Sequence, residues 1–234
     1  PETSIGWYRK HFNVDSKDTG QRFQIQFDGI FRDANIWLNG FYVGNNKSGY
    51  VGNAYDVTDY INFSGDNVLV VRVDATQYEG WFYEGAGIYR HVWLNQFNDL
   101  NIVNDGIFAS ANIQDNKAII NVETTIENQS FINEGCSVVA YLKDRNGKTV
   151  AASKEQSLSF NVNEDKTAKQ LLQISNPRLW SLEDPYLYRI AVEIKSGGKI
   201  IDAKELRFGI RNIEIKANGV FLNGKHIKLH GVNN

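Results

Sequence analysis

The sequence predicts an all-β protein of two domains, on three observations. Apolar and polar residues alternate through most of the chain, as Phe23, Ile25 and Phe27 do with their neighbours, and a period of two is typical of strands. Pairs such as Asn39-Gly40 separate the alternating runs, as in β-hairpins. The helical period is nearly absent, and 234 residues make about two domains at roughly 100–200 residues each.

The first half of the chain favours a jelly roll over residues 1–97. Strands are expected at 5–10, 23–27, 34–38, 41–43, 67–73 and 88–94. The run 67–73 is apolar at successive positions, so we expect it to be buried on both faces. The composition turns polar from Asn95 to Asn104, and the domain boundary is placed near Phe97.

The second half predicts a sandwich of immunoglobulin type over residues 98–208. Alternating runs at 118–126, 138–142, 169–174, 186–195 and 199–208, with Gly197-Gly198 as a turn, support it. Cys136 is the single cysteine, so no disulfide can link the two sheets and packing alone must hold them.

The C-terminal stretch carries a separate signal. Asn223-Gly224 lies between apolar runs and predicts a type I′ turn, followed by a strand from about Ile227 to Val232. We expect residues 213–234 to form a hairpin that is loosely packed or paired with a neighbouring molecule, because exposed strands seek partners. With Pro1 first and no methionine, the chain is expected to be a processed or excised part of a longer protein.

Composition argues against several functions. The net charge is −2 without a basic block, which disfavours nucleic acid as a partner. No apolar run approaches the ~20 residues of a membrane helix.

Gly85-Ala86-Gly87 has Arg90 where a dinucleotide loop needs its third glycine, so we expect a tight turn and no cofactor. His226 and His230 would share one strand face but lack a third ligand, so no metal is expected. The compartment is not indicated.

The candidate site is the stretch containing Glu79, Trp81, Tyr83 and Glu84. Carboxylates beside aromatic rings are typical of sugar sites, because rings stack on the apolar faces of pyranoses. The alternative is that the rings pack between domains and the carboxylates are solvated. Glu79 and Glu84 are not expected to be a catalytic pair, since nothing holds them rigid or separates their pKa values.

Five stretches, in one order along the chain, resemble glycoside hydrolase family 2, which contains β-galactosidases, β-glucuronidases and β-mannosidases. They are Gly6-Trp7-Tyr8-Arg9-Lys10, Ile36-Trp37-Leu38-Asn39-Gly40, Gly85-Ala86-Gly87-Ile88-Tyr89-Arg90, Pro177-Arg178-Leu179-Trp180 with Phe208-Gly209-Ile210-Arg211, and Leu222-Asn223-Gly224-Lys225 with Leu229-His230-Gly231-Val232-Asn233. The first and third are most similar to β-galactosidases.

The resemblance implies a sugar-binding domain at 1–97, an immunoglobulin-like domain at 98–208, and at 209–234 the start of a catalytic (β/α)8 barrel. It implies that the loop with Trp81 and Glu79 touches the sugar. Asn233 would end the first barrel strand, where it either lines the sugar pocket or makes a structural hydrogen bond. Arg90 is expected to be a buried ion-pair partner and Trp180 a core residue.

The function implied is that of a non-catalytic N-terminal part of a retaining β-glycosidase, a β-galactosidase before the others, with carbohydrate as partner and homo-oligomers left open. Its acid/base and nucleophile would lie in the missing part of the barrel. The chain alone is therefore expected to be inactive and to bind sugar weakly or undetectably. The alternatives are a free-standing carbohydrate-binding or adhesion protein and a structural spacer. The barrel-entry hairpin favours the glycosidase.

Overall fold

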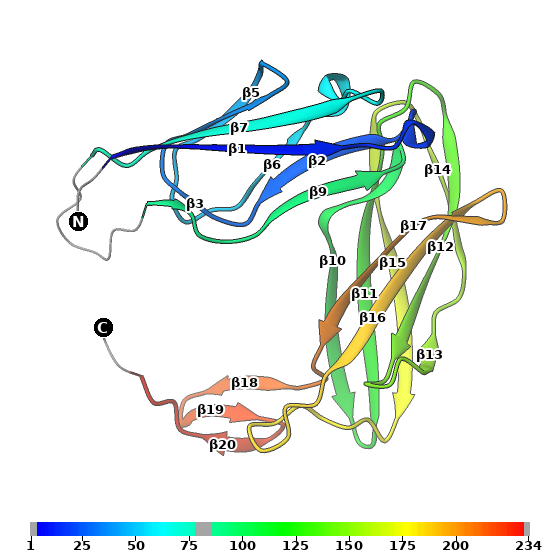
Figure 1. Cartoon of the computed structure of the whole chain (residues 1–234). Coiled ribbons are helices and arrows are strands. Elements are labelled where there is room, and N and C mark those ends of the chain that lie inside the picture. Colours follow the sequence, from blue (N-terminus) through cyan, green and yellow to red (C-terminus); the bar gives the residue numbers. More distant parts are fainter. Residues whose placement is uncertain (1–3, 78–85, 232–234) are drawn as a thin grey trace. The chain divides into compact units, whose positions relative to one another are not determined.

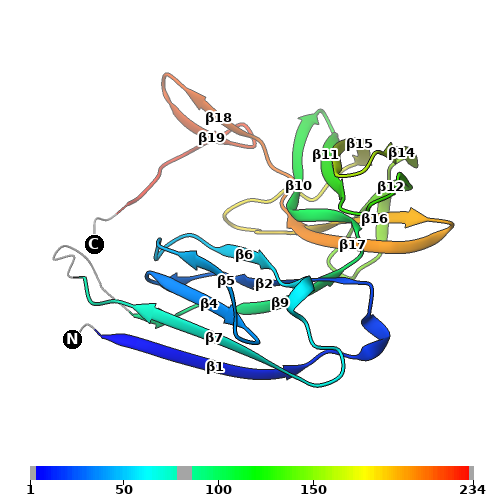
Figure 2. The ribbon, with the colours of Figure 1, turned by 90° about the horizontal axis from the view of Figure 1, so that it is seen from above.

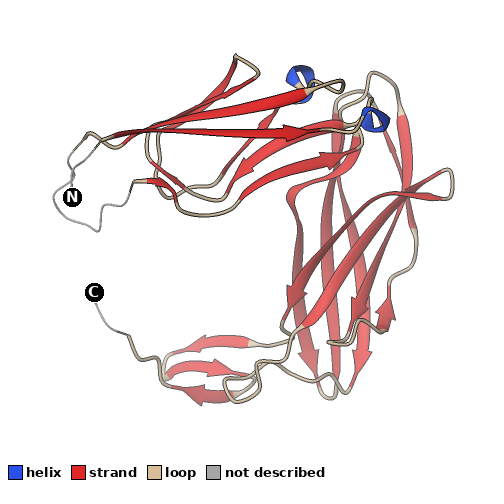
Figure 3. Ribbon diagram, viewed as in Figure 1, coloured by secondary structure: helices blue, strands red, loops and turns tan. Residues whose placement is uncertain are grey.

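A computed structural model describes residues 4–77 and 86–231 (Figure 1). In these residues strands dominate, and the helices are two single 3-10 turns, η1 (Ser16–Asp18) and η2 (Thr58–Tyr60), drawn in blue in Figure 3. The all-β prediction is confirmed. Turns of this length cannot cross a bilayer, and no described helix is long or apolar enough to do so. The chain divides into two compact units, residues 1–98 and 99–234.

The first unit is built from two main antiparallel sheets (Figure 2) and a small third one. One sheet has the order β1 (Ile5–Asn13), β7 (Asp66–Asp74), β4 (Ala34–Leu38), β5 (Phe41–Asn46). The second has the order β6 (Asn53–Asp56), β2 (Arg22–Phe27), β9 (Val92–Phe97), and the third pairs β3 (Ile30–Phe31) with β8 (Gly87–Ile88). Residues from both main sheets, such as Phe27 of β2 and Ile36 of β4, share one buried cluster, as the jelly-roll prediction requires.

Two strand predictions in this unit are wrong in part. The run 67–73 is buried on one face only: Leu69 and Val71 are in the core, whereas Val70 is half-buried on the other face. Its sheet packs on the core with one face and exposes the second, as antiparallel sheets commonly do. The expected strand 88–94 is interrupted at residues 89–91, because β8 pairs with β3 and β9 pairs with β2.

The predicted turn pairs adopt the backbone that hairpins need. Asn39 and Gly40 have φ of 52° and 87°, and Asn223 and Gly224 have φ of 50° and 76°. The pair Gly197-Gly198, at 56° and 77°, closes the hairpin between β16 and β17. Glycine and asparagine tolerate the left-handed region, so local chemistry sets these turns.

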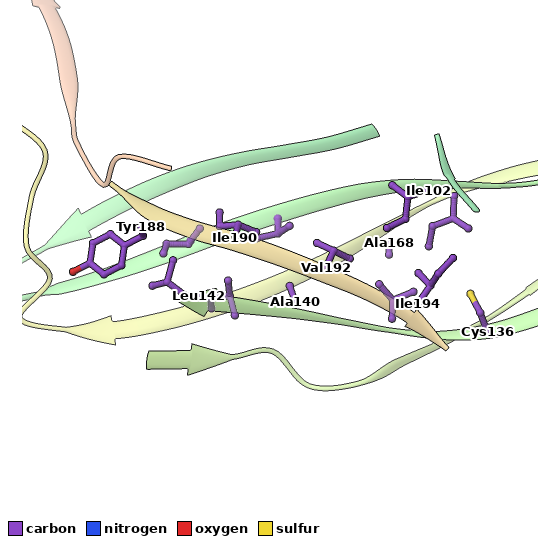
Figure 4. Close-up of a cluster of buried hydrophobic side chains, with 14 of the residues drawn as sticks. Ile102, Cys136, Ala140, Leu142, Ala168, Tyr188, Ile190, Val192 and Ile194 are labelled. Atoms are coloured by element: carbon purple, nitrogen blue, oxygen red, sulfur yellow. The ribbon is translucent and has the colours of Figure 1, made fainter. Parts of the chain in front are cut away.

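The second unit contains the immunoglobulin-like sandwich. One sheet has the order β10 (Leu100–Gln114), β11 (Lys117–Asn128), β15 (Glu164–Ser175). The facing sheet has the order β13 (Thr149–Ala152), β12 (Glu134–Lys143), β16 (Tyr188–Ser196), β17 (Lys199–Phe208), with β14 (Gln156–Phe160) also paired to β12. Figure 4 shows Ile190, Val192 and Ile194 along β16 in the core, and Cys136 is also buried there.

The C-terminal strands β18 (Ile213–Lys216), β19 (Gly219–Leu222) and β20 (Lys225–Ile227) form a small antiparallel sheet. The expected strand from Ile227 to Val232 is therefore wrong: β20 ends where that strand was to begin, because only Lys225–Ile227 find backbone partners on β19. Ile215 is 84% and Leu229 73% exposed, while Leu222 is buried.

Trp180 is not the core residue that the sequence predicted. It is half-buried and its ring lies against Gly209, where an added Cβ would approach the indole to 3.1 Å. The Trp180 carbonyl accepts a hydrogen bond of 3.0 Å from Asn223 Nδ2, and its N–H donates to the Ile210 carbonyl at 2.8 Å. Trp180 thus ties the C-terminal sheet to the loop before β16.

Candidate functional site

The three predicted sugar-contact residues, Glu79, Trp81 and Asn233, lie outside the described residues, as do Tyr83 and Glu84. What the structure describes is the base from which the 78–85 stretch leaves. Strand β7 ends at Asp74, and the chain continues through Thr76 to Gln77. The candidate site is therefore built from the side chains around that base.

A polar pocket of about 280 Å³ lies at this base. Its lining residues are Arg32, Asp33, Lys47, Asp74, Thr76 and Gln77. They come from the end of β7, the segment between β3 and β4, and the loop after β5. The Asp74 N–H donates to the Arg32 carbonyl at 3.1 Å, which fixes two of these segments side by side.

Arg32 is the buried cation of the pocket, with 9% of its surface exposed. Its Nη2 donates to the Gln77 carbonyl at 2.9 Å, and its guanidinium lies 5.5 Å from the centroid of the Phe31 ring. A buried charge is costly unless it is hydrogen-bonded, so these contacts explain how the cation is tolerated. Through Gln77, Arg32 also orders the residue that precedes the 78–85 stretch.

Asp74 provides a fixed negative charge. Thr76 donates to its carboxylate through Oγ1 at 2.6 Å and through its N–H at 3.1 Å, and Arg72 Nη2 lies at 2.7 Å. The Thr76 hydrogen bonds, followed by that of Arg72, lower the pKa of Asp74 below its ordinary value. A general acid at neutral pH needs a raised pKa. Asp74 is therefore suited to accepting hydrogen bonds from a hydroxylated ligand and unsuited to protonating a leaving group.

Two further expectations are corrected by the structure. Arg90 is exposed, so it is not a buried ion-pair partner; with Tyr89 it lies on the turn at Gly29, where an added Cβ would meet both side chains. His226 is in β20, where its ring packs edge-on against Phe221, whereas His230 follows the strand. The two histidines therefore do not share a strand face.

Sequence reasoning missed the pocket because its members are far apart in the chain. Arg32 and Asp74 carry no motif, and they meet only because the segment before β4 pairs beside the end of β7. The available signal was weak: a charged residue directly follows a strong apolar strand at Asp74, and strand ends often carry functional side chains.

The described residues thus form a jelly roll with a polar pocket, an immunoglobulin-like sandwich and a further small sheet, and a fold of this kind does not by itself fix a function. Comparison with known proteins gives the family. Residues 1–98 match "Glycosyl hydrolases family 2, sugar binding domain" and residues 102–211 match "Glycosyl hydrolases family 2". The chain belongs to glycosyl hydrolase family 2.

Relatives carry two different names. The chain is 35% identical to a β-galactosidase of Bacteroides ovatus and 31% identical to a β-glucuronidase of Formosa agariphila, over 97% and 96% of its own length. It spans only 27% and 25% of those two proteins. A crystal structure of a family 2 member from Bacteroides cellulosilyticus superposes with a TM-score of 0.92 at 36% identity, covering 97% of this chain and 31% of that one.

Proposed function

We propose that the chain is the non-catalytic N-terminal part of a retaining β-glycosidase, a β-galactosidase that hydrolyses terminal β-linked sugars. The observation that carries the proposal is the order of the matched domains, sugar-binding domain first and the second family 2 domain after it. The β-galactosidase relative from Bacteroides ovatus supports the choice of glycone. The sheet of β18, β19 and β20 is proposed to lead into the catalytic barrel, with residues 209–234 as its beginning.

In this proposal the chemistry lies outside the chain. A retaining glycosidase needs two carboxyl groups ~5–5.5 Å apart, one as acid/base and one as nucleophile. Such groups must be held to within about 0.5 Å by their supporting side chains. Asp74 is held by hydrogen bonds from Thr76 and Arg72, but its lowered pKa leaves it ionised at neutral pH and unfit to act as the acid.

We propose that the 78–85 stretch delivers Trp81 and Glu79 to the sugar, while Asn233 contributes from the barrel side. The polar pocket supports this, because Arg32 anchors Gln77, the residue that precedes this stretch. Trp81 would stack on the sugar ring, and Glu79 would accept hydrogen bonds from its hydroxyls. Variants Trp81→Ala and Glu79→Gln in the full-length enzyme should raise KM more than they lower kcat.

The deciding experiment compares this 234-residue chain with its full-length parent on aryl β-galactoside, β-glucuronide and β-mannoside substrates. The parent should turn over the β-galactoside fastest and with retention, and the chain alone should turn over none. Turnover by the purified chain that Glu79→Gln abolishes would overturn the assignment of chemistry to the barrel. A parent that prefers the β-glucuronide would correct the glycone, and one inert on all three would favour a carbohydrate-binding protein.

A further inference from the structure

The outer face of the β1-β7-β4-β5 sheet carries aromatic side chains that the core does not use. Trp7 of β1 is 63% exposed and Tyr42 of β5 is 53% exposed, with half-buried Trp37 of β4 between them. The rings of Trp7 and Trp37 stack with centroids 5.9 Å apart, and Trp37 meets Tyr42 edge-on at 5.7 Å. These three residues are termed the aromatic face.

Strand register explains why the rings meet. Arg9, Val70, Trp37 and Tyr42 stand in one cross-strand row. The adjacent row contains Trp7, Arg72 and Asn35. Side chains of such rows project from the same side of a sheet. The two indoles therefore lean toward each other across β7, and polar groups stand beside them on the same surface.

The polar groups beside the rings are largely hydrogen-bond donors. Asn35 Oδ1 accepts from the Tyr42 hydroxyl at 3.3 Å and from Asn45 Nδ2 at 3.3 Å, while the Asn35 amide N–H groups have no partner among the described residues. Arg72 is paired with Asp74 at 2.7 Å. Arg9 is exposed and makes no ion pair with any described residue. The surface thus offers N–H donors and one positive charge, that of Arg9, which has no ion-pair partner among residues 4–77 and 86–231.

This combination fits a carbohydrate. Trp and Tyr rings have apolar faces and polar edges, and a pyranose likewise has an apolar C–H face and a rim of hydroxyls that accept from N–H donors. The Arg9 guanidinium beside the rings complements a negative charge on the ligand. Four strands at about 4.8 Å spacing span roughly 14 Å, which is the length of a short oligosaccharide. The match of residues 1–98 to a sugar binding domain supports the same ligand class.

We propose that the aromatic face binds a β-linked oligosaccharide, and that Arg9 selects chains that carry carboxylates. Trp7 and Tyr42 stack on the sugar rings, and Asn35 donates to a hydroxyl. This inference goes beyond the proposed function and does not depend on it, because every residue of the face lies in the first unit. It concerns a surface formed by described residues of β1, β4 and β5.

The test is calorimetric titration of the 234-residue chain at low salt with two probes, a β-1,4-mannuronate tetrasaccharide and a β-1,4-galactose tetrasaccharide. Both should bind in the millimolar range or tighter, the acidic one about tenfold more tightly, with an advantage that shrinks as salt is added. Trp7→Ala should weaken both by at least about tenfold. Arg9→Gln should abolish only the preference for the acidic probe.

Two variants guard against misfolding and nonspecific effects. Tyr42→Ala should also weaken binding, and it tests the face independently of Trp7. Phe131 is 92% exposed in the second unit, so Phe131→Ala is the matched aromatic control and should leave both affinities unchanged. Circular dichroism should show the same strand content in all four variants.

The proposal is overturned if neither tetrasaccharide binds, or if both bind with affinities that Trp7→Ala and Tyr42→Ala leave unchanged. Equal affinity of the unsubstituted chain for the two probes overturns the role given to Arg9. None of these outcomes affects the turnover comparison that tests the proposed function. The sugar-binding proposal for the aromatic face and the proposed function can therefore fail separately.

Discussion

The two sandwiches of this chain differ in how their edges are closed. In the second unit, β16 has a pairing strand on each side, β12 and β17, and its core positions Ile190 and Ile194 are fully buried. In the first unit, Leu94 and Val92 of β9 stand opposite Ile25 and Phe27 of β2, and the two β2 residues are 2% and 1% exposed. Their β9 partners are 42% and 40% exposed. On β9, which has a pairing strand on one side only, these two inward-facing positions are therefore left partly open to solvent.

The second unit covers its edge with side chains that reach between its sheets. Asp202 of β17 accepts from the Ile102 N–H of β10 at 2.9 Å, and Lys204 Nζ donates to the Val103 carbonyl at 3.1 Å. Burial lowers the pKa of Lys204, as expected for an ammonium drawn into such a junction. The first unit has instead an apolar groove of about 440 Å³ between β1 and β9. The core of the second unit is therefore closed between β10 and β17, whereas the core of the first unit is open between β1 and β9.

The largest effect should come from a cavity in the closed core. Leu142 is 0% exposed among the residues of the second unit's cluster, so Leu142→Ala should cost about 2–5 kcal/mol of unfolding free energy, because the surroundings relax only partly. Urea-dependent hydrogen exchange, followed on peptides from each unit, would measure it. Exchange in the first unit should stay unchanged. A cost below about 1 kcal/mol would mean that this core is not closed.

Sequence could predict what depends on neighbours in the chain. The turn at Asn39-Gly40 and the alternating strand at 118–126 follow from local chemistry, and both are present. Sequence could not predict that the run 67–73 has an open face or that the chain breaks at residues 89–91. Those features depend on which strands lie alongside, and pairing across distant residues leaves no local signal.

The same limit applied to the candidate site. Carboxylates beside rings in the 78–85 stretch indicated sugar chemistry from residue types alone, and this remains a proposal. The pocket at its base needed the contact between the Arg32 carbonyl and the Asp74 N–H, which joins residues far apart in the chain. The aromatic face likewise needed the register of four strands.

Cys136 gives a second way to compare the cores. Burial raises the pKa of its thiol to about 11, and since only the thiolate reacts, labelling by a disulfide reagent at pH 8 should be at least about a hundredfold slower than in urea-unfolded protein. The rate should rise with pH up to about 11. The matched probe is Leu94→Cys in a Cys136→Ala background, which should react as an exposed thiol. If Cys136 and the cysteine of Leu94→Cys are labelled at equal rates in the native protein, the two cores do not differ in how open they are.

A smaller effect is expected from shortening a side chain at the open edge. Leu94 faces inward but is 42% exposed, so Leu94→Ala removes surface that water already reaches and should cost about 1 kcal/mol or less. The same hydrogen-exchange measurement on peptides of the first unit gives the loss of unfolding free energy, which is then compared with the loss for Leu142→Ala. If Leu94→Ala costs as much as Leu142→Ala, the groove between β1 and β9 is filled in solution.

The smallest effect concerns the rim of the groove, where Trp93 of β9 contacts Asp28. The indole Nε1 donates to Asp28 Oδ2 at 2.9 Å, and this hydrogen bond is the main cause that lowers the pKa of Asp28, assisted by Gln26 and His91. A lowered folded-state pKa means that the stabilisation is fully present above the unfolded-state pKa and is lost as pH falls through the folded-state value.

Replacing Trp93 by phenylalanine should therefore move the titration midpoint of Asp28 up toward that of an ordinary aspartate, as followed by the NMR shift of its side-chain carboxyl carbon. In the unsubstituted chain, Trp93 fluorescence should change at the same low pH at which Asp28 is protonated. Asp184 serves as the control in the second unit, because Arg178 lowers its pKa through hydrogen bonds of 2.6 and 3.0 Å and should do so equally in both proteins. An Asp28 midpoint that Trp93→Phe does not move would show that β9 is not held to the turn after β2 by this contact. The hydrogen bond from Trp93 to Asp28 would then not stabilise the open edge at β9.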